Sequence, residues 1–235
     1  MKKVRGVFAL LTALVVVSMI PSASAALLGT VALLPGDTVV PGLTSAAPGT
    51  LLASLSAPYV SSLGTTAGTL NSAVYREAGG TLDFYYQVTN NTTAPNCGAA
   101  GQPACDPLSR ETDTTFTGFT TSVGYRTDGG SIAGGFVNGS VAPVTADRNS
   151  VGDVVGFSFN PPDAAKIQPG QTSDVLVIST NATNFTSGNA SVIDGGVTTV
   201  KAFEPTSATP EPVTFVLTGM GLLTLAGLRR RFIVK

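Results

Sequence analysis

The sequence has 235 residues, no histidine and no tryptophan, and a formal net charge of −1 at pH 7. Seven of its thirteen basic residues stand near the two ends. Within residues 26–208, six basic residues face thirteen acidic ones, a formal charge of −7. An acidic body without a basic patch argues against binding of nucleic acid or of an anionic membrane surface. The absence of histidine removes the commonest general base and the commonest metal ligand.

Residues 1–25 are typical of a signal peptide. A positively charged start precedes an uncharged, mostly apolar run over residues 6–20. Ala23 and Ala25 then give the small-x-small pattern that signal peptidase accepts. We therefore expect cleavage after Ala25 and export of the chain that follows.

Residues 209–235 combine three features in a fixed order. Pro210-Glu211-Pro212 precedes an uncharged run over residues 213–228, and three arginines follow it, Arg229, Arg230 and Arg231. At about 1.5 Å per residue, the run would form a helix about 24 Å long, and snorkelling arginines can close the gap to a hydrocarbon core of about 30 Å. We expect a single transmembrane helix over residues 213–228, with the arginines in the cytoplasm.

This C-terminal stretch resembles the PEP-CTERM sorting signal of exopolysaccharide-producing Gram-negative bacteria. The resemblance covers only residues 209–235. It implies that exosortase, a membrane protease, cuts near Pro210-Glu211-Pro212 and frees the body from its helix. The two prolines favour an extended chain, which a protease cleft can grip. The alternative is a plain tail anchor with a proline-rich stalk, which does not require a glutamate between the two prolines.

Cys97 and Cys105 are the only cysteines, and the chain is expected to reach an oxidising compartment. Seven residues rich in glycine, alanine and proline separate them. We predict a local disulfide that closes this loop. Two thiolates without a histidine are too few ligands for a metal site, and we expect neither a metal nor a cofactor.

The body, residues 26–208, reads as short strands separated by Gly, Pro and Asn clusters. Residues 26–66 carry one charged side chain, Asp37, and we expect part of this stretch to be loosely ordered. The clearest strand is 81–89, whose strict alternation is typical of a half-buried antiparallel strand. Its predicted partner is 70–77, joined through Ala78-Gly79-Gly80.

Further strands are predicted at 114–127 with a bulge at Gly118, at 153–160, at 173–180, and in a hairpin of 190–193 with 197–203 around Asp194-Gly195-Gly196. Residues 173–180 are apolar on both faces, which favours a central strand covered twice. The predicted core residues are Leu82, Phe84, Tyr86, Val88, Val155, Phe157, Phe159, Val175 and Val177. Together these patterns predict an all-β body, a single antiparallel β-sandwich of jelly-roll kind.

Paired carboxylates are the only catalytic device that the composition allows, and Glu77, Asp83 and Glu111 are the best candidates. A glycosidase needs two carboxyl groups facing each other across a cleft. The simpler interpretation is that these are surface acids, and we expect no catalysis. Calcium is a further candidate, but Asp128-Gly129-Gly130 and Asp194-Gly195-Gly196 each supply one carboxylate and read first as turns.

Four tyrosines, Tyr75, Tyr85, Tyr86 and Tyr125, could form an outward aromatic strip that stacks on sugars. Ordinary strand composition is the simpler explanation; Tyr86 fits the core, and Tyr85 is the better surface candidate. Closely spaced Asn-x-Ser/Thr triplets over residues 181–191 indicate an exposed loop.

We therefore expect an exported, exosortase-processed protein of the cell surface or extracellular matrix, with a structural or interaction role in biofilm or envelope polysaccharide. Before processing, the chain would be anchored in the inner membrane and face the periplasm. Its expected partners are signal peptidase, exosortase and extracellular polysaccharide, with no nucleic acid. The alternatives are a carbohydrate-binding module and, third, a secreted hydrolase.

Overall fold

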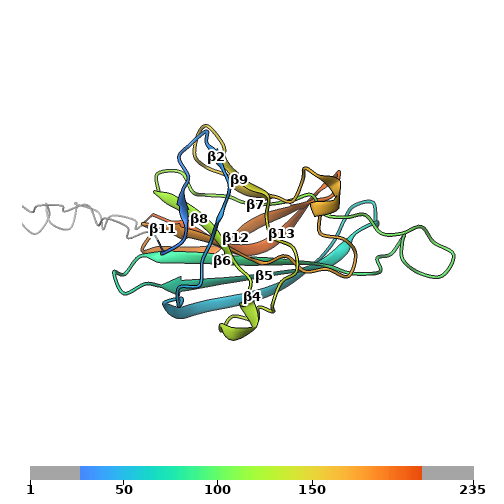
Figure 1. Ribbon diagram of the computed structural model, residues 1–235, viewed down its shortest axis with the longest axis horizontal. Helices are drawn as coiled ribbons and strands as arrows, with labels where there is room; N and C mark the ends of the chain where they lie inside the picture. The colour runs from blue at the N-terminus through green and yellow to red at the C-terminus, as the bar shows by residue number, and fades with distance from the viewer. Residues whose placement is uncertain (1–26, 208–235) are drawn as a thin grey trace, which may run out of the picture.

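The computed structural model describes residues 27–207, and these form two β-sheets packed face to face (Figure 1). Sheet A runs in the order β1 (Val31–Ala32), β8 (Thr121–Arg126), β11 (Val175–Thr180), β6 (Leu82–Asn90), β5 (Ala67–Arg76) and β4 (Thr50–Val60), and β3 (Gly42–Leu43) also pairs with β8. Sheet B runs in the order β13 (Val197–Thr206), β12 (Asn184–Ile193), β7 (Arg110–Asp113), β10 (Val155–Ser158), β9 (Thr145–Arg148) and β2 (Thr38–Val39). All pairings are antiparallel except that of β3 with β8. The predicted all-β sandwich of antiparallel sheets is confirmed at this level.

The main hydrophobic core lies between the two sheets. Sheet A contributes the predicted residues of β6, and Phe84 meets the ring of Phe116 edge-on with centroids 6.0 Å apart. Sheet B contributes Val155 and Phe157 from β10, and Phe159 follows that strand. These side chains are fully buried, as their alternation predicts.

Val175 and Val177 do not face this core, which corrects the prediction. Leu176 and Ile178 occupy the inner positions of β11, so the two valines point to the opposite face of sheet A. There they join a second apolar cluster with Tyr75, Tyr85, Phe136, Ala73 and Leu27. The expectation that this strand is covered on both faces is confirmed, since all of β11 is buried.

β6 is also buried on both faces, so its interpretation as a half-buried strand was wrong. The segment 128–140, which includes a short 3₁₀ turn η1 (Gly129–Ser131), lies over the outer face of sheet A (Figure 1). Gln87 holds it there: its amide nitrogen donates to the Val137 carbonyl (2.8 Å), and its amide oxygen accepts from the Val137 N–H (2.9 Å). Polar residues at alternate positions of a strand therefore do not by themselves show that this face is exposed to solvent. On β6, Gln87 uses its polar group to bind a covering segment.

The predicted strand 114–127 is instead a corner between the sheets. β7 ends in sheet B at Asp113 and β8 begins in sheet A at Thr121. Between them, Phe116 turns into the core and Gly118 adopts φ +84° in an exposed turn. Apolar residues occur at both odd and even positions of this stretch because the chain passes from one sheet to the other. The prediction of a single strand with a bulge was therefore wrong.

Other expectations have mixed outcomes. The β5–β6 hairpin and the β12–β13 hairpin form as predicted, although both strands of the second are longer than expected. Residues 181–191, expected to be an exposed loop, mostly belong to β12, and the stretch 26–66 contains four strands, among them the eleven-residue β4. A second short 3₁₀ turn, η2, spans Asp163–Ala165.

Within residues 27–207 no helix has the length and apolar character needed to cross a membrane. The expected helix over 213–228 lies outside the described residues.

Candidate functional site

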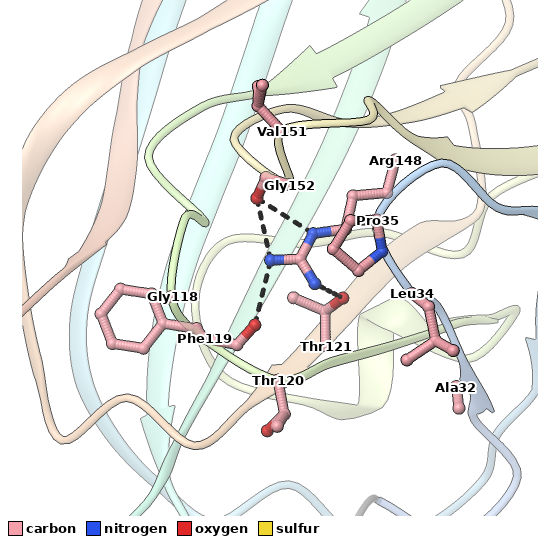
Figure 2. A pocket seen from close by; sticks show the side chains of 10 residues that line it. All are labelled: Ala32, Leu34, Pro35, Gly118, Phe119, Thr120, Thr121, Arg148, Val151 and Gly152. Atoms are coloured by element: carbon pink, nitrogen blue, oxygen red, sulfur yellow. Dashed lines mark hydrogen bonds between the residues drawn. The ribbon is translucent and has the colours of Figure 1, made fainter.

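A hollow of about 480 Å³ opens at one end of the sandwich, between β1, the corner after β7 and the turn that follows β9 (Figure 2). Its lining includes Leu34, Pro35, Phe119, Thr120, Arg148 and Val151. Leu34 and Val151 are 63% and 69% exposed, so the rim is both apolar and open to solvent. Sequence reasoning missed this site because its residues come from three segments that no motif connects.

Arg148 forms the floor of the hollow and is almost completely buried. Its guanidinium donates to the carbonyl oxygens of Leu33 (3.4 Å), Phe116 (2.7 Å), Phe119 (3.0 Å) and Gly152 (2.8 Å) and to the Thr121 hydroxyl (3.1 Å). Figure 2 shows the guanidinium between Gly152, Phe119 and Thr121. Burial lowers the pKa of Arg148 below its usual value.

These contacts define what the hollow can do. The Arg148 Nε also donates to the Gly152 carbonyl (3.0 Å), so every nitrogen of the guanidinium has an acceptor. An anion would have to displace those carbonyls, which leaves the arginine a structural role in pinning the corner to the turn after β9. The hollow therefore offers a mostly apolar contact surface, with the hydroxyls of Thr120 and Thr121 in its lining and no carboxylate.

The three candidate carboxylates do not form one site. Asp83 lies on the outer face of β6, where it accepts a hydrogen bond from the Ser179 hydroxyl (2.6 Å). Burial, aided by the nearby Glu77 carboxylate, raises the pKa of Asp83 to about 7, while the Ser179 bond opposes the rise. Glu77 itself accepts from the Gly49 N–H (2.9 Å). The structure thus brings Glu77 and Asp83 together and places Glu111 in the other sheet.

Glu111 is paired with Asp113, a residue that sequence reasoning did not select. Glu111 stands opposite Phe157 and Val192 in sheet B, both of them core residues, so its side chain enters the space between the sheets. Asp113, two residues further along β7, shares that face. The i, i+2 spacing on a strand was the available signal. The interpretation of Glu111 as a surface acid was wrong.

The Glu111–Asp113 pair is fully withdrawn from solvent. No other described residue donates a hydrogen bond to any of its four carboxyl oxygens. Burial raises the pKa of Glu111, and burial together with the Glu111 charge raises the pKa of Asp113 well above its usual range. Burial raises the pKa of Tyr86, and the nearby Asp113 and Glu111 carboxylates raise it further. The Tyr86 hydroxyl donates to the Phe203 carbonyl (2.7 Å). Carboxyl groups that keep their protons, and so stay neutral, fit this environment, and a substrate has no access to them.

The predicted aromatic strip is not on the surface. Tyr75, Tyr85 and Tyr86 are buried, and only Tyr125 is partly exposed. Tyr75 and Tyr85 pack against each other, with ring centroids 4.6 Å apart, beneath the covering segment 128–140. The carbohydrate-binding alternative therefore loses the feature that suggested it.

The two Asp-Gly-Gly stretches are turns. Asp128 pairs with Arg126 (Nε to Oδ1, 2.8 Å), which holds the pKa of Asp128 below its usual value. Asp194 accepts from the Gly196 N–H (3.1 Å) within the β12–β13 turn. In the described part of the chain, no group of three or more Cys, Asp or Glu side chains is placed to hold a metal ion.

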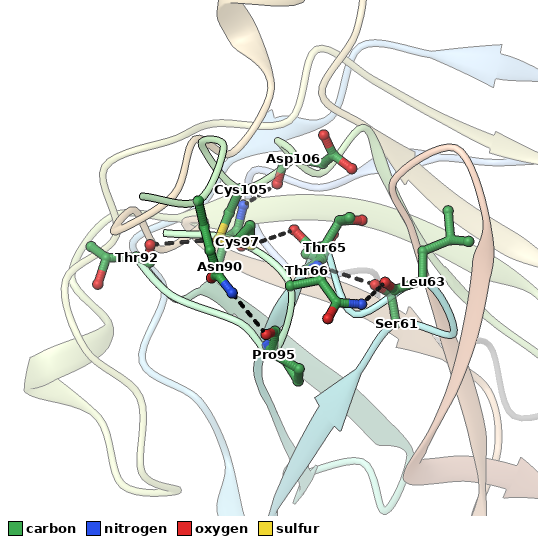
Figure 3. Close-up of a disulfide and its surroundings, with 12 residues drawn as sticks. Ser61, Leu63, Thr65, Thr66, Asn90, Thr92, Pro95, Cys97, Cys105 and Asp106 are labelled. Carbon is green, nitrogen blue, oxygen red and sulfur yellow. Dashed lines mark hydrogen bonds between the residues drawn. A yellow bond between two sulfur atoms is a disulfide. The ribbon is translucent and has the colours of Figure 1, made fainter. Parts of the chain in front are cut away.

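The predicted disulfide is present, joining Cys97 to Cys105 with Cα atoms 4.9 Å apart (Figure 3). Both cysteines are buried, and the loop is anchored on each side of the bridge. The Asn96 side chain donates to the Leu63 carbonyl (2.7 Å), and the Asp106 N–H donates to the Thr65 carbonyl (3.0 Å). The bridge closes the loop, and these two hydrogen bonds attach it to the turn between β4 and β5.

The targeting residues lie outside the described part. This applies to the cleavage-site residues Ala23 and Ala25, to Pro210-Glu211-Pro212, and to the three arginines at 229–231. The chain matches no protein-family model, no curated protein and no solved structure at a significant level.

Proposed function

We propose that this chain is an exported, non-catalytic protein with a structural or interaction role in the envelope or in extracellular polysaccharide. Signal peptidase would remove residues 1–25, and exosortase would cut near Pro210-Glu211-Pro212. The body would first be held in the inner membrane facing the periplasm, and would then pass to the cell surface or the medium.

The observation that carries the proposal is the Cys97–Cys105 disulfide. Such a bond persists in oxidising compartments and is rare in the cytosol, so it supports the route that the two ends of the sequence indicate. The proposed absence of catalysis is supported by the withdrawal of Asp83 and Glu111 from solvent, since acid catalysis needs carboxyl groups that reach a substrate.

The sorting route is tested by changing Pro210, Glu211 and Pro212 together to alanine in the producing cell. Alanine lets the helix extend through the motif, which removes the extended segment that a protease can grip. We expect the full-length form, with its arginine tail, to accumulate in the inner membrane. Fractionation followed by intact-mass analysis measures this.

A matched control replaces Ser207 and Thr209 by alanine and leaves the motif intact. This control should be cut and released like the wild type. Release of the triple variant at the normal size and rate would mean that the tripeptide is only a stalk, and it would remove the sorting part of the proposal.

A further inference from the structure

The two sheets have four outer edges, and three of them are poor sites for pairing with another chain. β1 and β2 are each two residues long. β13 is longer, but it carries Lys201, Glu204 and Pro205. Short length, charged side chains and proline are the usual devices by which a sheet edge resists pairing.

The fourth edge, β4, has few of these devices. The strand is eleven residues long, and its only partner among the described strands is β5. No charged side chain occurs anywhere from residue 38 to residue 75. β4 lies at the margin of sheet A in Figure 1, and alternate side chains along it are exposed.

The backbone direction along β4 follows from its hairpin. The Ser61 N–H donates to the Thr66 carbonyl (2.9 Å), so Ser61 faces β5 with its backbone. Because backbone direction alternates along an antiparallel strand, Ser54, Ser56 and Pro58 turn their backbone groups outward. Val60 turns outward as well, but Pro58 has no N–H and separates it from the serines, so Ser54 and Ser56 are the two successive outward positions with both a donor and an acceptor.

We propose that β4 pairs antiparallel with β4 of a second copy of this chain, with Ser54 of each copy opposite Ser56 of the other. This register matches the outward donors of one copy with the outward acceptors of the other. It also leaves Pro58 at the end of the paired stretch, opposite the irregular part of β4 near Leu52, where the pairing with β5 shifts register.

Self-pairing is favoured over pairing with another edge for two reasons. In a second copy, the other described edges are short or charged, so β4 is the one long uncharged edge it can offer. A strand without charges also meets itself without placing like charges opposite each other. A two-fold pair of this kind closes on itself, because it uses the free edge of both copies. The inference rests on the proposed structural role, for which it names the partner.

The pairing is tested on the full chain, purified in a mild detergent. In sedimentation velocity over a concentration series, the wild type should form dimers. Ser56→Lys should weaken dimerisation by about tenfold or more, because two ammonium groups would meet near the two-fold axis. The matched control is Thr199→Lys, an exposed position on the already charged β13, which should dimerise like the wild type.

The register is tested with Ser54→Cys and Ser56→Cys, two small changes at exposed positions. Under mild oxidation, a mixture of the two variants should form a disulfide-linked heterodimer, and neither variant alone should cross-link to itself to the same extent. Cross-linking of Ser56→Cys alone would overturn this register.

A wild type that stays monomeric would overturn the inference as a whole. So would dimers that survive Ser56→Lys and Thr199→Lys equally, which would indicate association through the apolar ends of the chain. Neither result touches the sorting route, because that is measured by the cutting of the Pro210-Glu211-Pro212 variant.

Discussion

Replacing Glu111 by glutamine should make the stability of this protein less dependent on pH. Burial raises the pKa of Glu111 from its ordinary value of 4.5 to about 8 in the folded chain. Below pH 4 the folded and unfolded chains both hold the proton. As the pH rises past the ordinary value, the unfolded chain releases the proton while the folded chain retains it. The free energy of unfolding therefore falls until the pH reaches the folded pKa, where the loss is complete.

The size of this loss follows from the pKa shift. Each pKa unit corresponds to about 1.4 kcal/mol, so the rise to about 8 amounts to about 4–5 kcal/mol in all, of which about 3–4 kcal/mol is lost between pH 5 and pH 8. Asp83, with its pKa raised to about 7, acts in the same direction. Glutamine has nearly the shape of glutamate and cannot release a proton, so Glu111→Gln should remove the Glu111 part and leave that of Asp83. It should also reduce the part of Asp113, whose pKa is raised by burial and by the Glu111 charge.

The assay is urea unfolding at a series of pH values, read by circular dichroism. Asp163→Asn is the control, because the Asp163 side chain is 83% exposed and its ion pair with Lys166 is on the surface. The control should show the same pH dependence as the wild type. A wild-type stability that is flat or rises from pH 5 to pH 8, or an unchanged slope in Glu111→Gln, would refute the reasoning.

Two further changes test the bridge and the core. Cys97→Ser should lower the free energy of unfolding by about 2–3 kcal/mol, because the short loop is ordered and the bridge restricts the unfolded chain. An unchanged urea midpoint would contradict this. Mass analysis should also show that the oxidised wild type is two hydrogens lighter than its reduced form. Phe84→Ala should lower the free energy of unfolding by about 3–5 kcal/mol, since the ring is fully buried against Phe116 between the sheets. Thermal or urea unfolding measures this. A variant as stable as the wild type would mean that the ring does not fill the core.

The sequence predicts the strands whose pattern is local. Strict alternation over 81–89 identified β6 and its inner face, and the Asp194-Gly195-Gly196 turn identified the last hairpin. What alternation cannot specify is what covers the second face of a sheet. Tyr85 and Gln87 look solvent-facing by type, yet a distant segment covers them and supplies the partner of Gln87. Asp83 looks solvent-facing too, but it is buried beside Ser179 of the neighbouring strand. The sequence also could not decide which face Val175 and Val177 take, because residues 175–178 are apolar on both faces.

The candidate site depends even more on distant contacts. Arg148 looks like one scattered cation in the sequence, and all but one of its acceptors are backbone carbonyls, which carry no residue signature. The Glu111–Asp113 pair could be found by its spacing on a strand. Its burial could not, because acidic residues are usually exposed and the sheet position of β7 is set by pairing with β10 and β12.

The Arg148 contacts have a consequence for the order in which the chain folds. The guanidinium joins segments near residues 33, 116–121 and 152, and the first of these is more than a hundred residues away from Arg148 in the chain. All of them must be in place before its donors are satisfied, so the full set of bonds can form only after β1 and the corner between the sheets have docked. Interactions that form this late stabilise the native state without speeding its formation, and they act by slowing its unfolding. Under the proposed export, which would take the chain away from cytosolic chaperones, Arg148 would therefore contribute to how long the folded state lasts.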